Sequence, residues 1–168
     1  PPQSAHLKKW TSGNVWNPLI HIVKSPPQLW ALVFSGVLVL AQFVIIPFLS
    51  PSLVANAGLS EGQLPYIYLV GGGLSILTGP LVGRWADKYG KQYVFRRAVL
   101  VSLLPIFLIT HMPAAPVYAI LALAGFFFVC VGGRMIPAMA MVSATATPEY
   151  RGSFMSVVSC VQQFMSAI

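Results

Sequence analysis

Long apolar stretches alternate with short polar connections along most of the chain, and each stretch predicts a helix. These helices are expected at about 29–49, 64–83, 93–112, 117–145 and 153–168. A helix needs about 20 apolar residues to cross about 30 Å of hydrocarbon, and the first four stretches reach that length. The fifth spans only about 24 Å at a rise of about 1.5 Å per residue, so we expect the chain to stop inside it. The pattern predicts an all-α membrane protein with a bundle of five transmembrane helices.

The first 28 residues differ from the rest because they are polar and mixed. A stretch near 15–23 is predicted to lie at the membrane interface, where tryptophan is favoured. The sequence therefore predicts a linker at 1–28 and a helical bundle at 29–168, whose first helix should end before Pro51. The chain opens on Pro1 rather than Met, which is typical of an excerpt from a longer protein.

Composition and charge support a membrane protein. Hydrophobic residues make up 57% of the chain and charged residues 8%, whereas a soluble domain carries roughly a quarter charged residues. The net charge of +7 could indicate nucleic acid, but the bases flank the apolar stretches, as topology-setting charge does. No nucleic-acid partner is therefore expected. Nine of the ten bases fall on one side of the predicted alternation, so the positive-inside rule places 1–28 and 84–92 in the cytoplasm.

Small residues recur every four positions along the second predicted helix. They are Gly71, Ser75, Gly79 and Gly83. Lipid supplies little hydrophobic drive between helices, so close backbone approach at small residues holds a bundle together. We predict that Gly71, Ser75 and Gly79 pack against a neighbouring helix, although glycine is common in membrane helices generally.

The connection between the second and third helices holds a lone acid among glycines and bases. It reads Gly83-Arg84-Trp85-Ala86-Asp87-Lys88-Tyr89-Gly90-Lys91-Gln92. Gly90 permits a tight turn with positive φ, and Asp87 can cap a nearby helix or pair with a base from an adjacent one. Lys88 and Lys91 can hold anionic membrane lipids or the carboxyl ends of helices.

This connection resembles the signature of the major facilitator superfamily, which runs glycine, three residues, aspartate, a base, any residue, glycine and a base. Trp85 departs from it, because a small aliphatic residue is usual there, and Gln92 replaces a customary second base. The resemblance implies a gating motif on the matching positions. These are Gly83, Asp87, Lys88, Gly90 and Lys91.

Two further stretches fit the same resemblance. Arg134 stands in the fourth helix, and Pro148-Glu149-Tyr150-Arg151-Gly152 looks like the family's connection into the next helix. The run from Gln42 through Gly71 resembles second halves of bacterial drug and sugar efflux members. The resemblance therefore implies part of a twelve-helix fold, with helices seven to eleven favoured over one to five and the other half of the transporter as partner. It also implies alternating-access efflux of a drug-like compound or sugar, coupled to protons, across the bacterial inner membrane, without a cofactor.

Four polar residues inside the predicted spans are candidates for substrate contact or coupling. Arg134 is the only charge away from the ends of the predicted spans. A charge near mid-bilayer costs at least about 2.5–3.5 kcal/mol on insertion scales, so it should face the bundle interior or a wet cavity. Its role is open between substrate contact or proton coupling and a structural role on backbone carbonyls. Gln42, Gln162 and Gln163 are also mid-span and could line a cavity.

Other function classes find less support in the sequence. The predicted spans hold no Asp or Glu, although proton-coupled transport normally needs a titratable group in the pathway, so we expect that carboxylate in the other half. Cys130 and Cys160 have no CxxC partner, and neither a disulfide nor a metal site is predicted. A membrane-embedded enzyme would need clustered catalytic residues, which do not appear. A non-transporting family member, serving as sensor or scaffold, stays open.

Overall fold

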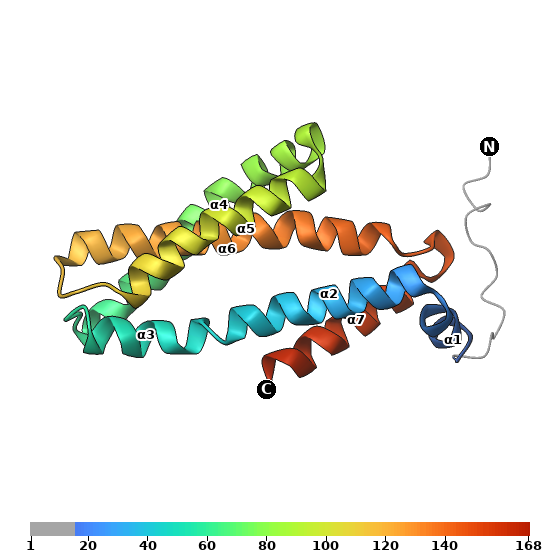
Figure 1. Ribbon diagram of the computed structural model, residues 1–168, viewed down its shortest axis with the longest axis horizontal. Coiled ribbons are helices and arrows are strands. Elements are labelled where there is room, and N and C mark those ends of the chain that lie inside the picture. The colour runs from blue at the N-terminus through green and yellow to red at the C-terminus, as the bar shows by residue number, and fades with distance from the viewer. Residues whose placement is uncertain (1–15) are drawn as a thin grey trace, which may run out of the picture.

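Every regular element in the described part of the chain, residues 16–168, is a helix in this computed structural model (Figure 1). In chain order these are α1 (Trp16–Lys24), α2 (Pro26–Phe43), α3 (Ile46–Ala55), the 3-10 helix η2 (Glu61–Gln63), α4 (Leu64–Tyr89), α5 (Lys91–Thr110), α6 (Val117–Ala144), the 3-10 helix η3 (Pro148–Tyr150) and α7 (Arg151–Ser166). The all-α class predicted from the sequence is confirmed.

Four segments are long and apolar enough to cross a membrane. They are Pro26–Ala55, Glu61–Tyr89, Lys91–Thr110 and Val117–Ala144. They correspond to the first four predicted helices. The fifth helix, α7, has 16 residues and is not among these candidates. The described residues therefore form four candidate spans and one shorter helix, which agrees with a fifth stretch too short for a full crossing.

The first span differs from its predicted form, because it is interrupted in the middle. The helix α2 ends at Phe43, and α3 then runs from Ile46 through Pro51 to Ala55. Pro47 has no N–H to offer to the Phe43 carbonyl, which explains a break just before it. The prediction that the helix ends before Pro51 was wrong. Membrane helices tolerate proline where the freed carbonyl is satisfied locally.

The second span extends beyond its predicted end. The helix α4 continues to Tyr89, and α5 begins at Lys91, so the connection expected at 84–92 is helical on both sides of Gly90. Gly90 has a φ of +93°, a value that ends a helix and that glycine adopts without strain. A single residue therefore separates the two helices.

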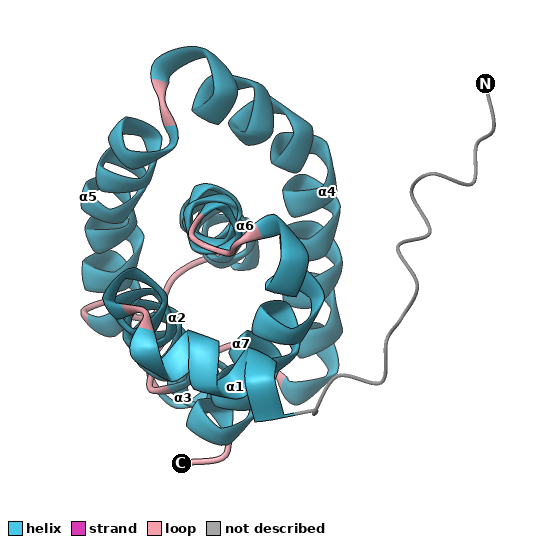
Figure 2. Ribbon diagram, turned by 90° about the vertical axis from the view of Figure 1, so that its right-hand side faces the viewer, coloured by secondary structure: helices cyan, strands magenta, loops and turns pink. Residues whose placement is uncertain are grey.

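The helix α6 lies at the centre of the bundle (Figure 2), with α4 and α5 packed along it. The helix α2 packs mainly against α7 and has much less contact with α6. The described helices thus form two groups, α4–α5–α6 and α2–α7, with a narrow contact between them.

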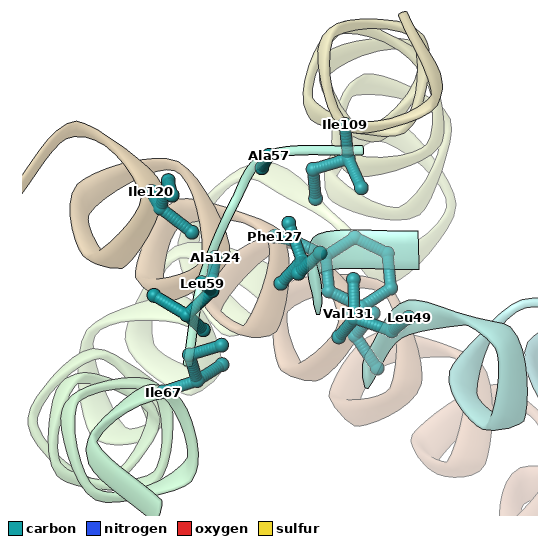
Figure 3. Packing of buried hydrophobic residues seen from close by; sticks show 10 residues of the cluster. Leu49, Ala57, Leu59, Ile67, Ile109, Ile120, Ala124, Phe127 and Val131 are labelled. Carbon is teal, nitrogen blue, oxygen red and sulfur yellow. The ribbon is translucent and has the colours of Figure 1, made fainter. Parts of the chain in front are cut away.

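Two buried apolar clusters lie toward opposite ends of the bundle. The larger one joins α3, α4, α5 and α6 (Figure 3). It contains Leu49, Leu53, Ala57, Leu59, Ile67, Ile109, Ile120, Ala124, Phe127 and Val131. The smaller one joins α1, α2, α6 and α7, and contains Ile22, Ala31, Val142, Phe154 and Val158. We refer to them as the large and the small cluster.

Glycines bring α4 and α6 close together, and each glycine faces a larger side chain of the other helix. The pairs are Gly71 with Phe128, Gly79 with Ile136, Gly125 with Leu74, and Gly133 with Val82. The two pairs with a glycine on α4 are eight residues apart on both helices, and so are the two pairs with a glycine on α6. The helices α4 and α6 therefore run parallel in constant register. A Cβ added at Gly71 would overlap the Phe128 ring, and one at Gly125 would lie 2.8 Å from Leu74 Cδ1.

Replacing Gly71 by Ala should destabilise the bundle, whereas Gly72→Ala should not. A methyl group at position 71 would overlap the Phe128 ring, and such overpacking costs about 1–3 kcal/mol. Gly72 is exposed with no atom near its added Cβ, so alanine there gains only helix propensity. Thermal unfolding in detergent should give a lower midpoint for G71A alone. Equal midpoints for the two variants would contradict the α4–α6 packing described above.

Candidate functional site

Arg134 is buried near the middle of α6, with only 9% of its surface exposed. It belongs to a stripe at three- and four-residue spacing that shares one helix face. The stripe comprises Phe127, Val131, Arg134, Ala138 and Val142, all buried. Phe127 and Val131 belong to the large cluster and Val142 to the small one. The guanidinium therefore lies on the face of α6 between the two clusters.

Two of the three nitrogen atoms of this guanidinium have no hydrogen-bond acceptor in the described part of the chain. Its Nε and Nη2 atoms are buried and have no hydrogen-bond partner there. Buried polar groups in native proteins are nearly always paired, and each exception calls for an explanation. The unpaired donors mark Arg134 as a place where an acceptor is missing.

Gln42 lies on α2, the helix that packs mainly against α7 and has a smaller contact with α6. It sits in the last turn before the break at Val44–Ile45, and it is half-buried. Its Oε1 atom is also buried without a partner among the described residues. A second unsatisfied polar group therefore lies beside the interruption of the first span.

The two clusters place Gln42 and Arg134 at about the same depth. The helices α2 and α6 run in opposite directions (Figure 1), and Ala31 shares the small cluster with Val142, while Leu49 shares the large one with Val131. Gln42 follows Ala31 by 11 residues, and 11 residues back from Val142 is position 131. Gln42 precedes Leu49 by 7 residues, and 7 residues on from Val131 is position 138. Gln42 therefore lies opposite a position of α6 between 131 and 138. Arg134 lies within that interval. We call this depth the polar layer.

The two glutamines of α7 lie differently. Gln162 is half-buried, and its Nε2 donates to Met139 Sδ of α6 at 3.2 Å. Met139 is five residues from Arg134, or about 7.5 Å along the helix. Gln163 is exposed. Of the four intramembrane candidates, the structure brings Gln42, Arg134 and Gln162 to the interface between α6 and the α2–α7 group, and it leaves Gln163 outside.

The α4–α5 turn holds the residues of the expected gating motif. Asp87 and Lys88 are exposed, while Gly83 and Lys91 are half-buried. Lys88 Nζ lies 5.2 Å from the centre of the Tyr89 ring. Gly90 precedes α5, and no side chain caps that helix. Asp87 thus stands in the last turn of α4 and does not provide the cap that its position in the sequence suggested.

The helix-packing candidates have different surroundings. Gly71 and Gly79 face α6, as described above. Ser75 is half-buried, and its Oγ donates to the Gly71 carbonyl at 2.8 Å within α4. Gly83 has nothing within 4 Å of an added Cβ. The close approach to α6 therefore covers only part of the small-residue series.

An aromatic groove at the α4–α5 turn was missed in the sequence. It measures about 430 Å³ and is lined by Trp85, Tyr89, Tyr93, Val94 and Arg97. Arg97 Cζ lies 5.0 Å from the centre of the Tyr93 ring. The signal was available, since Trp85, Tyr89 and Tyr93 recur every four residues. Aromatic and basic side chains of this kind favour the boundary between lipid and water.

Replacing Gly90 by Ala should destabilise the α4–α5 hairpin. Gly90 has φ +93° and ψ 135°, close to a region that is essentially restricted to glycine and that costs other residues of order 1–3 kcal/mol. Gly83→Ala is the matched control, because Gly83 has a negative φ and open space around it. We expect a lower thermal unfolding midpoint for G90A than for G83A. Indistinguishable midpoints would show that the turn tolerates a side chain.

The family of the chain follows from comparison with known proteins. The family model described as Major Facilitator Superfamily matches residues 1–168. Neither the curated proteins nor the solved structures gave a match. The match agrees with four candidate spans, a glycine-packed central helix and a buried arginine between two helix groups. This chain is a multi-pass membrane protein that belongs to the major facilitator superfamily, a superfamily of membrane transporters.

Proposed function

We propose that this chain is part of a secondary active transporter that moves a small organic molecule by alternating access. The observation that carries the proposal is the buried, unpaired guanidinium of Arg134 in the polar layer. A charged residue inside a span is a functional-site candidate by default, because placing it there is costly. Gln42 and Gln162 complete a set of polar groups on facing helices.

The small contact between α2 and α6 supports an access pathway at this layer. The α4–α5–α6 group is closely packed, with glycines facing large side chains between α4 and α6. The contact between α2 and α6 is much smaller. In transporters of this architecture, the substrate site lies near the midplane, between parts that rock against one another. We place the access pathway on the face of α6 that carries Arg134, between this chain and the other half of the transporter.

Proton-coupled efflux is the finer part of the proposal. It is supported by the resemblance of the run from Gln42 through Gly71-Gly72 to second halves of bacterial drug and sugar efflux members. The three acids, Glu61, Asp87 and Glu149, lie at helix ends, so we assign the coupling carboxylate to the other half of the transporter. The α4–α5 turn then faces the cytoplasm of a bacterial inner membrane, with its bases near anionic lipids.

Transport by the full chain in proteoliposomes would test this function. A panel of drug-like compounds and sugars would be loaded, and their movement followed with and without an imposed pH gradient. We expect at least one compound to move and its flux to collapse when the gradient is removed. Flux that ignores the gradient would contradict proton coupling. Absence of flux for every compound, with folded protein, would favour the sensor or scaffold alternative.

Asp87→Asn should impair transport while leaving membrane insertion and folding intact. We propose that Asp87 latches the α4–α5 turn to a neighbouring element in one conformation, so removing its charge should lower the transport rate roughly tenfold or more, the effect of losing about 1.4 kcal/mol. Its exposure here fits a state in which the latch is open. Glu61→Gln, at the other end of α4, is the matched control and should transport normally. Unchanged transport in a folded D87N protein would reject the latch.

A further inference from the structure

We infer that the transported molecule carries a negatively charged group, and that Arg134 binds this group with Gln42 beside it. This inference rests on the proposed transport function and adds the chemical class of the substrate. A carboxylate is the simplest such group, and a phosphate or sulfonate has the same charge and acceptor chemistry.

Counting donors and acceptors in the polar layer shows what is missing. An arginine side chain has five N–H donors and no acceptor. Its Nε and Nη2 have no partner among the described residues, and neither has Gln42 Oε1. The hydroxyl of Ser35, two turns before Gln42 on α2, already donates to the Leu32 carbonyl at 2.9 Å. Gln42 can satisfy at most part of the guanidinium, so donors remain in excess. The missing partner must be rich in acceptors.

The charge balance gives the same answer. The carboxylates of Glu61, Asp87 and Glu149 lie at helix ends and are exposed. Asp87 belongs to the last turn of α4, and the α4–α5 turn lies away from α6 (Figure 1). No ion pair of Arg134 with any of them occurs within residues 16–168. Among residues 16–168 no group compensates the buried charge, so a neutral ligand would add nothing to balance it, whereas an anion would neutralise it.

The geometry of the guanidinium favours an oxyanion in particular. Its planar fork matches the two oxygens of a carboxylate or phosphate, which forms two parallel hydrogen bonds. Nε and Nη2 form one edge of that fork, and both atoms lack a partner among the described residues. Gln42 adds an amide whose N–H groups can donate to the same anion.

The polar layer is covered in this conformation, so the anion must enter when the helices that cover it move apart. Arg134 is 9% exposed, and Gln42 is half-buried. Gln42 directly precedes the break in the first span at Val44–Ile45. That break lets the α2 side of the layer move without unwinding a continuous helix. We place the entrance beside α2 on the face of α6 that carries Arg134, toward the other half of the transporter.

Binding of matched acid and neutral compounds to the full chain would test the inference. Two pairs serve as probes, glucuronate with glucose and salicylate with salicylamide. The readouts are the concentration-dependent shift of the thermal unfolding midpoint and competition in counterflow. We expect the acid of at least one pair to act at roughly tenfold or more lower concentration than its neutral partner, as charge-assisted hydrogen bonding predicts.

Variants separate substrate binding from a structural role. Arg134→Gln should abolish the preference for acids, and Arg134→Lys should keep part of it, because lysine retains the charge without the fork. Arg97→Gln removes an exposed arginine of α5 and should keep the preference intact. If Arg134 only binds backbone carbonyls, R134Q will lower stability, and the wild-type protein will treat acids and neutral compounds alike. Where R134Q does not fold, the wild-type comparison and Gln42→Leu decide.

The outcomes also separate this inference from the proposed function. Neutral compounds that are transported as well as their acids would overturn the anionic class and leave transport standing. Acids that bind through Arg134 without any flux would support the site and count against transport. An acid preference that persists in folded R134Q would reject Arg134 as the anion-binding residue.

Discussion

In lipid, apolar side chains gain little from leaving their solvent, so helices associate through close backbone approach. In this bundle that approach falls between α4 and α6, where glycines of each helix face Phe128, Ile136, Leu74 and Val82 of the other. The contact occupies one face of α6. It leaves a different face, the one with Arg134, turned toward α2 and α7. The place of the charged residue in the bundle thus depends on where the small residues are.

The burial of Arg134 opposes stability, since an unpaired charge at this depth costs at least about 2.5–3.5 kcal/mol. The surrounding side chains make the cost tolerable rather than removing it. The large and small clusters lie on either side of the polar layer and hold α6 at both ends of its buried stripe. A ligand that neutralises the guanidinium would recover part of that free energy only when bound. Under the proposed function, the layer would therefore favour binding and release over permanent structural pairing.

Much of the architecture could be predicted from the sequence, because hydrophobic length and small-residue spacing are local properties. The four spans and the packing surface at Gly71 and Gly79 follow from such patterns. The break at Val44–Ile45 was not predicted, because the effects of Pro47 and Pro51 depend on which freed carbonyls find other partners. The helical continuation to Tyr89 was also missed, since a charged segment past the hydrophobic core reads as a loop.

The candidate site was predicted only in part, for a different reason. Arg134, Gln42 and Gln162 stand out as polar residues in apolar stretches, but their common interface depends on the directions and registers of three helices. Gln163 directly follows Gln162 in sequence, but adjacent residues on a helix point in different directions, and Gln163 is exposed. Glycines on α6 were overlooked since Gly125 and Gly133 form no four-residue series of their own.

The single residue between α4 and α5 has a mechanical consequence. A joint of one residue has almost no slack, so the two helices must tilt together as one stiff hairpin. The 26 residues of α4 give this hairpin an arm of about 39 Å at about 1.5 Å per residue. A tilt of about 10° at one end of such an arm carries the other end sideways by about 7 Å, on the same rise. Small adjustments at the far ends of α4 and α5 would therefore be magnified at the turn that carries Asp87.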